Sequence, residues 1–547
     1  MTPFAPVSTL ATHDVTNQPD RFAGHNLYAI DRPLREAVLR EAGPWLDRRL
    51  ETLGAVLGSE DILEAGELAN RNPPELIGFD RYGRRLDEVR FHPAYHALMR
   101  LAMEHRIHSL SWSTAEPGAH VAHLAMAALF TQAEAGVVCP INMTYAAVAA
   151  LRDHPGIGRL WADRIVAGAY DAPLRPIADK AGITVGMAMT EKQGGSDVRA
   201  NSTRAAPVDQ ADGRYRLVGH KWFCSAPMSD GFLTLAQTAS GLSCFLVPRI
   251  VDDARNGIAI MRLKDKLGNR SNASAEIEYH DATGFLLGEE GRGVKVIIEM
   301  VHHTRLGCCA GSLGLMRMAL AQAVNHVGSR RAFQKTLIDQ PLMQRVIADL
   351  ALEYEAAVVL TARLARDFAA RPGPERAFGR LTTALGKYWL TKRVPGFVAE
   401  CMECHGGAGY VEETPMPRLF RESPLNAIWE GSGNVIALDV LRTLAREPMA
   451  VAAYRAELDL ARGGNATLDA AIDALSDSML ADPREQDGRL ITETMTLVLQ
   501  AALLVRHAPH AVSDAFCASR LGGQGGRSYG ILPPGTDINA IVDRQKF

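Results

Sequence analysis

Two short stretches in the second half of the chain carry residue types that suit acid–base chemistry on carbon. They are Gly406–Gly407–Ala408–Gly409–Tyr410 and Ile428–Trp429–Glu430–Gly431–Ser432–Gly433–Asn434. An apolar neighbour raises the pKa of a carboxyl group by desolvating its charged form, and glycine lets a flat ligand approach the backbone. Glu430 therefore suits a carboxylate that takes a proton from carbon beside a large cofactor. The alternative interpretation is an ordinary helix start with an acidic residue near a Gly-rich loop.

Two further stretches favour the cofactor interpretation. The first, residues 187–198 (Met-Ala-Met-Thr-Glu-Lys-Gln-Gly-Gly-Ser-Asp-Val), is an apolar run that opens into a loop of glycines and hydroxyl groups. Consecutive backbone N–H groups in such a loop can bind a pyrophosphate. The second, residues 219–225 (Gly-His-Lys-Trp-Phe-Cys-Ser), is an aromatic stretch that ends in a hydroxyl group.

The elements that must position these residues change character along the chain. Residues 1–185 are predicted to be mostly helical, because apolar residues recur at helical spacing over Leu34–Leu53 and Ala94–His105. Residues 136–143, with Cys139–Pro140, are predicted to break the chain before a helix over 144–151. Met143 and Thr144 then serve ordinary core packing or border a substrate cavity.

Residues 186–290 are predicted to form a β domain, since apolar and polar residues alternate over 275–280. Further strand candidates are 215–218, 232–237, 243–247 and 258–263. The helical period returns from Gly293, which predicts a C-terminal helical domain over 291–447 and an extra, mostly helical segment over 448–547. The fold class is therefore α+β with several domains.

Composition limits the function classes. A chain of 547 residues has room for three to four domains, and a net charge of −3 gives no general attraction to nucleic acid or anionic membranes. We expect no membrane span and no secretory leader, and hence a cytoplasmic protein. Cys401–Met402–Glu403–Cys404–His405 matches a covalent-haem pattern, but that chemistry needs an exported chain, so we predict no haem and no metal site.

Taken together, the motifs and their order resemble the acyl-CoA dehydrogenase family of flavoproteins. The stretch Lys264–Ser274 (Lys-Asp-Lys-Leu-Gly-Asn-Arg-Ser-Asn-Ala-Ser) adds to the resemblance, which covers nearly the whole chain. It implies an N-terminal helical domain, a middle β-barrel-like domain, a C-terminal four-helix bundle and FAD as cofactor. The resemblance is strongest to the adaptive-response branch of the family, which is linked to DNA alkylation damage.

The resemblance implies that Glu430 is the base that removes the α proton of an acyl thioester while flavin N5 takes the β hydride. Some family members carry this acid on an earlier helix, immediately before an arginine. Here that position is Thr304, ahead of Arg305, which leaves Glu430 as the candidate.

The resemblance also implies a set of FAD-binding residues. Phe223 stacks on the flavin and Ser225 donates toward N5, while Arg330 reaches the FAD of a neighbouring subunit and so implies a homo-oligomer, usually a tetramer. The full set is Met187, Met189, Thr190, Gly195, Ser196, Phe223, Cys224, Ser225, Arg330, Gly406, Gly407, Ile428, Trp429, Gly431, Ser432 and Asn434.

Three positions depart from the family pattern. Phe333–Gln334 stands where the family has Phe-Gly, and Pro341 stands where it has a glutamine that helps to hold the adenine end of the cofactor. Trp429 replaces the common tyrosine beside the base and narrows the acyl pocket.

Two functions follow from the resemblance. One is a catabolic dehydrogenase for short or branched acyl-CoA, with an electron-transferring flavoprotein as acceptor. The other, which we favour, is a protective flavoprotein that binds duplex DNA through the extra C-terminal segment and has weak dehydrogenase activity. Residues 451–547 contain nine Lys or Arg and twelve Asp or Glu, so a uniformly basic domain is absent. Five arginines either form a local patch or lie scattered: Arg484, Arg489, Arg506, Arg520 and Arg527.

Overall fold

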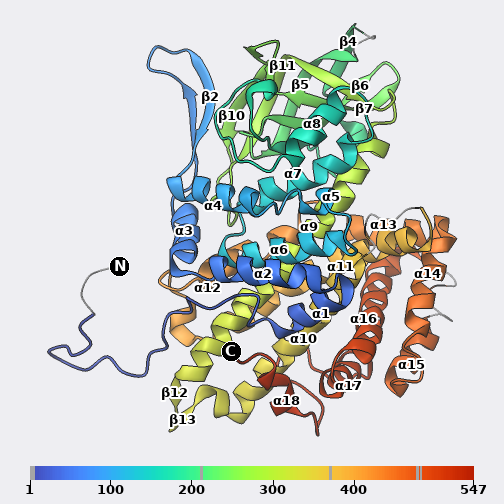
Figure 1. Cartoon of the computed structure of the whole chain (residues 1–547). Coiled ribbons are helices and arrows are strands. Elements are labelled where there is room, and N and C mark those ends of the chain that lie inside the picture. Colours follow the sequence, from blue (N-terminus) through green and yellow to red (C-terminus); the bar gives the residue numbers. More distant parts are fainter. Residues whose placement is uncertain (1–5, 210–212, 367, 369–371, 476–479, 481–482) are drawn as a thin grey trace.

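The predicted order of helical, β and helical domains is confirmed (Figure 1). The computed structural model describes residues 6–209, 213–366, 368, 372–475, 480 and 483–547. The β domain lies at one end of the molecule, and the C-terminal helices lie beside the N-terminal ones at the other end.

The N-terminal part is helical with one hairpin. Its helices are α1 (Arg32–Glu41), α2 (Pro44–Leu57), α3 (Glu60–Arg71), α4 (Pro93–Glu104), α5 (Leu110–Ser113), α6 (Ala119–Ala133), α7 (Val138–Leu151) and α8 (Ile157–Val166). The helix expected over 34–53 is two helices, because Gly43 takes a φ of 90° and Pro44 starts a new helix. The hairpin of β1 (Glu75–Phe79) and β2 (Arg85–Arg90) was not predicted, since its strands are short and mostly half-buried or exposed.

The break predicted over 136–143 is wrong for most of its length. Helix α7 begins at Val138 and runs through Cys139 and Pro140. Pro140 is the third residue of the helix, where the backbone N–H has no partner within the helix, so proline is tolerated there. Thr144 is fully buried, and its Oγ1 accepts a hydrogen bond of 3.1 Å from the N–H of Val185. Thr144 thus joins the helical domain to the β domain.

All the strand candidates lie within strands of the middle domain. These are β3 (Val185–Ala188), β4 (Arg204–Asp209), β5 (Arg214–Ser225), β6 (Gly231–Thr238), β7 (Gly241–Pro248), β10 (Ile258–Leu263) and β11 (Ser274–Leu287), with the short β8 (Ile250–Val251) and β9 (Ala254–Arg255) between β7 and β10. Strand β7 pairs with both β6 and β11, so the pairing β11–β5–β4–β6–β7 returns to β11 as a closed ring. The aromatic stretch 219–225 belongs to β5.

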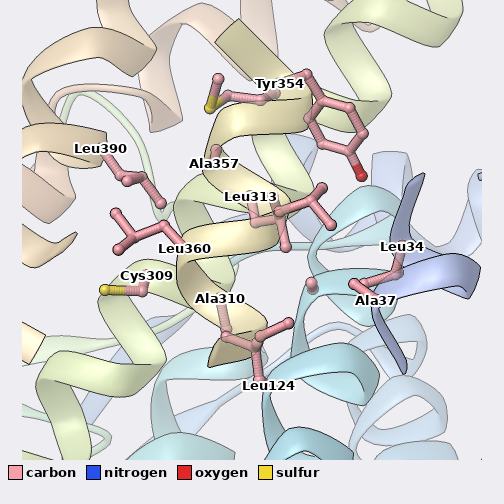
Figure 2. Close-up of a cluster of buried hydrophobic side chains, with 14 of the residues drawn as sticks. Leu34, Ala37, Leu124, Cys309, Ala310, Leu313, Tyr354, Ala357, Leu360 and Leu390 are labelled. Carbon is pink, nitrogen blue, oxygen red and sulfur yellow. The ribbon is translucent and has the colours of Figure 1, made fainter. Parts of the chain in front are cut away.

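Long helices form the C-terminal half. They are α9 (Gly293–Ser329), α10 (Pro341–Arg366), α11 (Pro374–Glu403), α12 (Met416–Glu422) and α13 (Gly433–Arg446). Shorter elements between them are β12 (Arg331–Ala332), β13 (Lys335–Thr336), η3 (Leu337–Asp339), η4 (Gly406–Gly409) and η5 (Leu425–Ala427). Leu313 of α9 and Leu360 of α10 share one apolar core with Leu124 of α6 (Figure 2). The N-terminal and C-terminal helices are therefore packed on each other.

The extra C-terminal segment continues this helical core. It contains α14 (Pro448–Asp459), α15 (Ala466–Ala474), α16 (Gly488–His507), α17 (His510–Phe516) and α18 (Ile538–Asp543), and α16 packs on α10, α11 and α13. The end of the chain is anchored by buried polar contacts. Arg544 Nε lies 2.8 Å from Glu355 Oε1, and Arg317 Nη1 donates to Gln545 Oε1 at 3.0 Å.

Two described segments are long and apolar enough to cross a bilayer by length and composition alone, although charged residues interrupt both apolar runs. Helix α9 and the segment Glu485–His507 reach the required length and composition. Within the protein, 94% of the apolar window of α9 is buried, as is 67% of that of the second segment. Burial inside the protein therefore accounts for their apolar character.

Candidate active site

Glu430 lies in the turn between η5 and α13, and helix α9 holds it there. Thr304 Oγ1 of α9 donates a hydrogen bond of 2.5 Å to Glu430 Oε2. The next residue, Arg305, donates from Nε to the backbone oxygen of Glu430 at 3.1 Å. Glu430 has a φ of +57°, an uncommon conformation for a residue with a side chain, and Gly431 follows with a φ of 103°. A non-glycine residue held this way by neighbouring groups is typical of a functional turn.

Burial raises the pKa of the Glu430 carboxyl group above its ordinary value. The hydrogen bond from Thr304 and the positive charges of Arg305 and Lys387 oppose this shift. Arg305 is itself bound to Asp439 at 2.7 Å, so part of its charge is neutralised. A carboxylate with a raised pKa is a stronger base, which suits proton abstraction near neutral pH.

Apolar side chains lie close to Glu430. One buried cluster contains Cys139 and Met143 of α7, and Met187, Met189 and Trp429 pack against it. Trp429 Nε1 donates to Asn426 Oδ1 at 2.9 Å, which fixes the indole ring. Met143 is thus a buried member of the cluster on which Trp429 packs, whereas Thr144 serves the packing of α7 on β3. Ile428 is mostly exposed.

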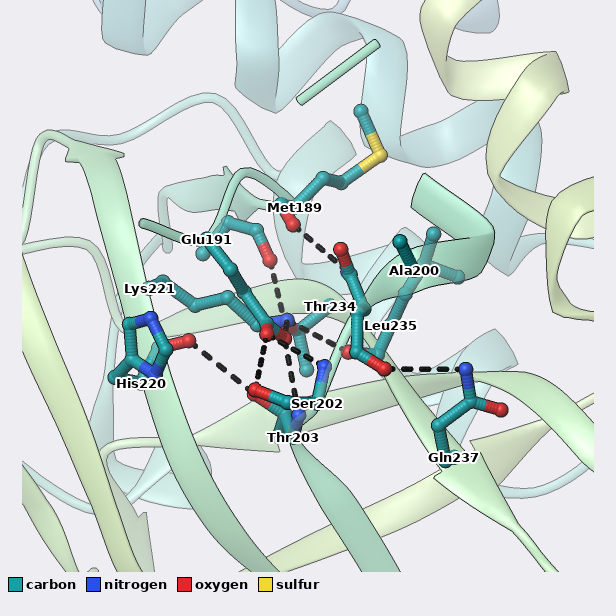
Figure 3. A network of polar contacts seen from close by, with 12 residues as sticks. Met189, Glu191, Ala200, Ser202, Thr203, His220, Lys221, Thr234, Leu235 and Gln237 are labelled. Atoms are coloured by element: carbon teal, nitrogen blue, oxygen red, sulfur yellow. Dashed lines mark hydrogen bonds and ion pairs between the residues drawn. The ribbon is translucent and has the colours of Figure 1, made fainter. Parts of the chain in front are cut away.

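A buried ion pair anchors the loop that follows Met189 (Figure 3). Lys221 Nζ of β5 lies 2.8 Å from Glu191 Oε1, and both side chains are fully buried. Glu191 also accepts hydrogen bonds from the N–H groups of Ser202 at 2.6 Å and Thr203 at 3.1 Å. Although burial acts against ionisation, Lys221 and these hydrogen bonds lower the pKa of Glu191, so the carboxylate stays charged. The pair fixes the loop to the sheet.

The end of β5 presents an aromatic face and a hydroxyl group. Phe223 is 49% exposed, and Ser225 is half-buried with its Oγ 3.3 Å from Ser274 Oγ. Cys224, also predicted to contact the cofactor, has a fully buried side chain that packs in the core of the β domain. Only its backbone can face a ligand, because successive side chains of a strand point to opposite faces.

These residues fit FAD. Besides the partly exposed ring of Phe223, they offer the hydroxyl groups of Thr190, Ser196 and Ser432, and the Ser432 side chain makes no capping hydrogen bond to α13. Ser432 precedes α13, so its hydroxyl group lies beside free N–H groups of the first helical turn. Gly194, Gly195 and Ser196 are exposed and can approach a pyrophosphate closely.

Three predicted FAD-binding residues lie far from Glu430 within one chain. Arg330 ends α9, about 39 Å from Thr304 at about 1.5 Å per helical residue. His326 of α9 and His405, which precedes Gly406 and Gly407, have ring centres 4.7 Å apart, so η4 lies at this same distant end. Arg330 donates to the backbone oxygen of Asn17 at 2.6 Å. One chain therefore does not bring these residues and Glu430 to one flavin ring.

The five C-terminal arginines do not form one free basic patch. Arg506 binds Glu457 at 2.7 Å, Arg520 binds Asp349 at 2.5 Å and Arg484 binds Asp487 at 2.7 Å. Arg489 donates from Nε to Asn434 Oδ1 at 2.7 Å, so the extra segment reaches a predicted cofactor-binding residue. Three of these side chains are thus paired with carboxylates, and a fourth is held by an amide oxygen.

Sequence reasoning missed the residues that hold Glu430 in place. Thr304 was considered only as the position of an alternative acid, and the pattern gave no role to Lys387 or Asp439. Lys387 donates to the backbone oxygen of Gly431, and Asp439 binds both Arg305 and Arg380. The available signal was the polar stretch His302–Arg305, which precedes a long apolar part of α9.

Comparisons with known proteins give family matches for three successive parts of the chain. Residues 17–172 match the family described as adaptive response protein AidB N-terminal domain, 186–282 the acyl-CoA dehydrogenase middle domain, and 291–445 the acyl-CoA dehydrogenase C-terminal domain. AidB of Escherichia coli (strain K12) is 46% identical over 519 residues, which cover 94% of this chain and 95% of that protein. Acyl-CoA dehydrogenase family member 11 of Caenorhabditis elegans is 31% identical over 469 residues, covering 81% and 75%.

Among solved structures, Caenorhabditis elegans ACDH-11 in complex with C11-CoA superposes with a TM-score of 0.82 at 26% identity, covering 98% of this chain and 95% of that one. The agreement extends beyond the acyl-CoA dehydrogenase core to the N-terminal domain and the extra C-terminal segment. The chain therefore belongs to the acyl-CoA dehydrogenase family of FAD-dependent oxidoreductases and is similar to AidB over nearly its whole length.

Proposed function

We propose that the protein oxidises the acyl group of a CoA thioester, with Glu430 as the base that removes the α proton. The observation that supports this most is the Glu430 carboxyl group, held by Thr304 in an apolar surrounding that raises its pKa. FAD, when bound, accepts the hydride from the β carbon.

The hydrogen-bond pattern leaves one carboxylate oxygen for the substrate. Thr304 occupies Oε2, whereas Oε1 has no hydrogen-bond partner among the residues that the structure describes and can face the α carbon. Arg305 and Lys387 bind the backbone oxygens of Glu430 and Gly431, which fixes the turn without neutralising the carboxylate directly. A base fixed in position loses little entropy when the substrate arrives.

The acyl chain would lie against the apolar wall of Met143, Met187 and Trp429. Because the indole of Trp429 is fixed by Asn426, it limits the width of this space and favours short or branched acyl groups. The C11-CoA bound to ACDH-11 supports a CoA thioester as the substrate class.

A panel of acyl-CoA thioesters tests this function. The FAD-loaded protein is mixed without oxygen with straight and branched thioesters of increasing length, and flavin absorbance is followed. Rapid bleaching by at least one short or branched thioester is expected, with slower bleaching by long chains. Holoprotein that keeps its full absorbance with every thioester would contradict the proposal.

We further propose a cytoplasmic homotetramer that passes electrons to an electron-transferring flavoprotein. The separation of Arg330, Gly406 and Gly407 from Glu430 supports an oligomer, because these residues reach a cofactor only from another subunit.

The second candidate is an AidB-type role in the DNA alkylation response, with binding of duplex DNA. The adaptive-response match over residues 17–172 and the similarity to AidB support it. Retardation of duplex DNA is expected at about 50 mM salt and should weaken steeply as salt rises, because phosphate contacts release counterions. Protein that leaves the mobility of duplex DNA unchanged at this salt concentration would rule the role out.

A further inference from the structure

The loop Lys264–Ser274 is one of the most distinctive motifs of the sequence, yet it takes no part in the proton abstraction described above. It connects β10 to β11 and ends beside the last residue of β5, because Ser274 pairs with Ser225 across the two strands. Its two lysines face different surroundings. Lys264 binds Glu276 at 2.6 Å and covers the ring of Trp222, whereas Lys266 is half-buried and has no carboxylate partner within ion-pair distance among the described residues.

Lys266 joins a short chain of hydrogen bonds that ends at Ser225. Its Nζ donates to the backbone oxygen of Asn272 at 2.5 Å and to Ser274 Oγ at 3.2 Å. Ser274 Oγ lies in turn 3.3 Å from Ser225 Oγ. An ammonium group only donates, so Ser274 must accept from Lys266. Accepting from a cation makes the Ser274 hydroxyl group a stronger donor, which favours donation to Ser225.

When Ser274 donates to Ser225, the proton of Ser225 can point away from Ser274. A hydroxyl group has one proton to donate. Ser225 accepts the hydrogen bond from Ser274, so its own proton is not used in that bond. Ser225 also makes a hydrogen bond with the thiol of Cys139, and because sulfur is a weak acceptor, a ligand oxygen or nitrogen can compete with it for the Ser225 proton. The Ser225 proton is therefore available to a ligand at the end of β5.

The thiol of Cys139 is influenced by Lys266, Glu430 and Ser225, so these three residues lie near one another. Burial raises the pKa of this thiol to about 12, and the charge of Lys266 is the strongest influence that opposes the shift. Glu430 and Ser225 act on the same thiol. Burial also lowers the pKa of Lys266 to about 8, with Cys139 and Glu422 as the neighbours that oppose it, so the ammonium form still predominates at neutral pH.

We propose that Lys266 is a positioning residue that acts through Ser274 to direct the Ser225 hydroxyl proton at the edge of the bound flavin, and that it thereby favours the reduced cofactor. The inference rests on the proposed function in one respect, namely that the flavin ring lies against Ser225. A reduced flavin ring carries more negative charge than an oxidised one, so a fixed donor backed by the half-buried ammonium group of Lys266 would stabilise it preferentially.

The test measures the equilibrium between oxidised and reduced FAD in the holoprotein against a reference dye of known potential at neutral pH. Lys266→Met removes the charge, Lys266→Arg keeps it, and Ser274→Ala interrupts the chain while leaving Lys266 in place. Lys546→Met, at an exposed ion pair near the C-terminus, is the matched control.

At a fixed dye potential, the ratio of reduced to oxidised FAD is expected to fall about tenfold in Lys266→Met and in Ser274→Ala. Lys266→Arg should stay close to the parent, and Lys546→Met should equal it. FAD-loaded Lys266→Met or Ser274→Ala with the parent ratio would overturn the proposal. If Lys266→Met fails to fold or to bind FAD, Ser274→Ala still decides.

This experiment is independent of the thioester panel. If no thioester reduces the parent flavin, the proposed function fails, while the dye equilibrium still reports whether Lys266 acts on the cofactor.

Discussion

Replacing Glu430 with glutamine is expected to slow thioester-dependent flavin bleaching by about 10³-fold, because the amide cannot accept the α proton. The substitution keeps the shape of the side chain, and the amide oxygen can still accept the hydrogen bond from Thr304. FAD binding should therefore be unchanged. The measurement is the single-turnover bleaching rate with the best thioester of the panel, together with the FAD content of the variant.

The pH dependence of the bleaching rate is a second test of Glu430 as the base. The base acts only when ionised, and burial raises the pKa of Glu430, so the rate should fall on acidification at a pH above the ordinary range of glutamate. Thr304→Val removes a hydrogen bond that lowers this pKa, so its acid limb should move to still higher pH. A Glu430→Gln variant that bleaches as fast as the parent would show that another group is the base.

Lys221→Met is expected to lower the free energy of unfolding by about 3–5 kcal/mol, because it leaves the charge of Glu191 buried without its partner. The same change should weaken FAD binding, since Glu191 fixes the loop that carries Thr190 and Ser196 (Figure 3). The measurements are the midpoint of thermal unfolding and the dissociation constant for FAD.

Two controls make this prediction specific. The double variant Glu191→Leu with Lys221→Met removes both charges and should recover much of the lost stability, because no uncompensated charge remains. Arg159→Met breaks an ion pair whose side chains are 71% and 66% exposed, and should cost less than about 1 kcal/mol. Equal losses in Lys221→Met and Arg159→Met would show that the buried pair does not anchor the loop.

Some parts of the fold could be read from the sequence because their signals are local. The alternation over 275–280 predicted β11, and the helical period after Gly293 predicted α9. The helix over 34–53 and the break before residue 144 were misjudged, since a few residues around a glycine or proline decide whether a helix ends or starts. The apolar character of α9 is explained only by its packing. A helix buried on all sides has the composition of a membrane span, and only its packing distinguishes the two.

The sequence by itself determined which residues are the candidates for chemistry. Residue type and spacing singled out the carboxylate at Glu430, the Gly- and hydroxyl-rich loop after Met189 and the aromatic end of β5. The tertiary structure alone decided how these groups are held. Thr304 lies 126 residues from its partner Glu430, and Lys221 lies 30 residues from Glu191. Lys266 lies 8 residues from Ser274. A sequence pattern carries no information on which helix or strand faces which, because that depends on how the cores pack. The same packing places the side chain of Cys224 in the core of the β domain. It also places Arg330 at the far end of α9 from Thr304, which holds Glu430.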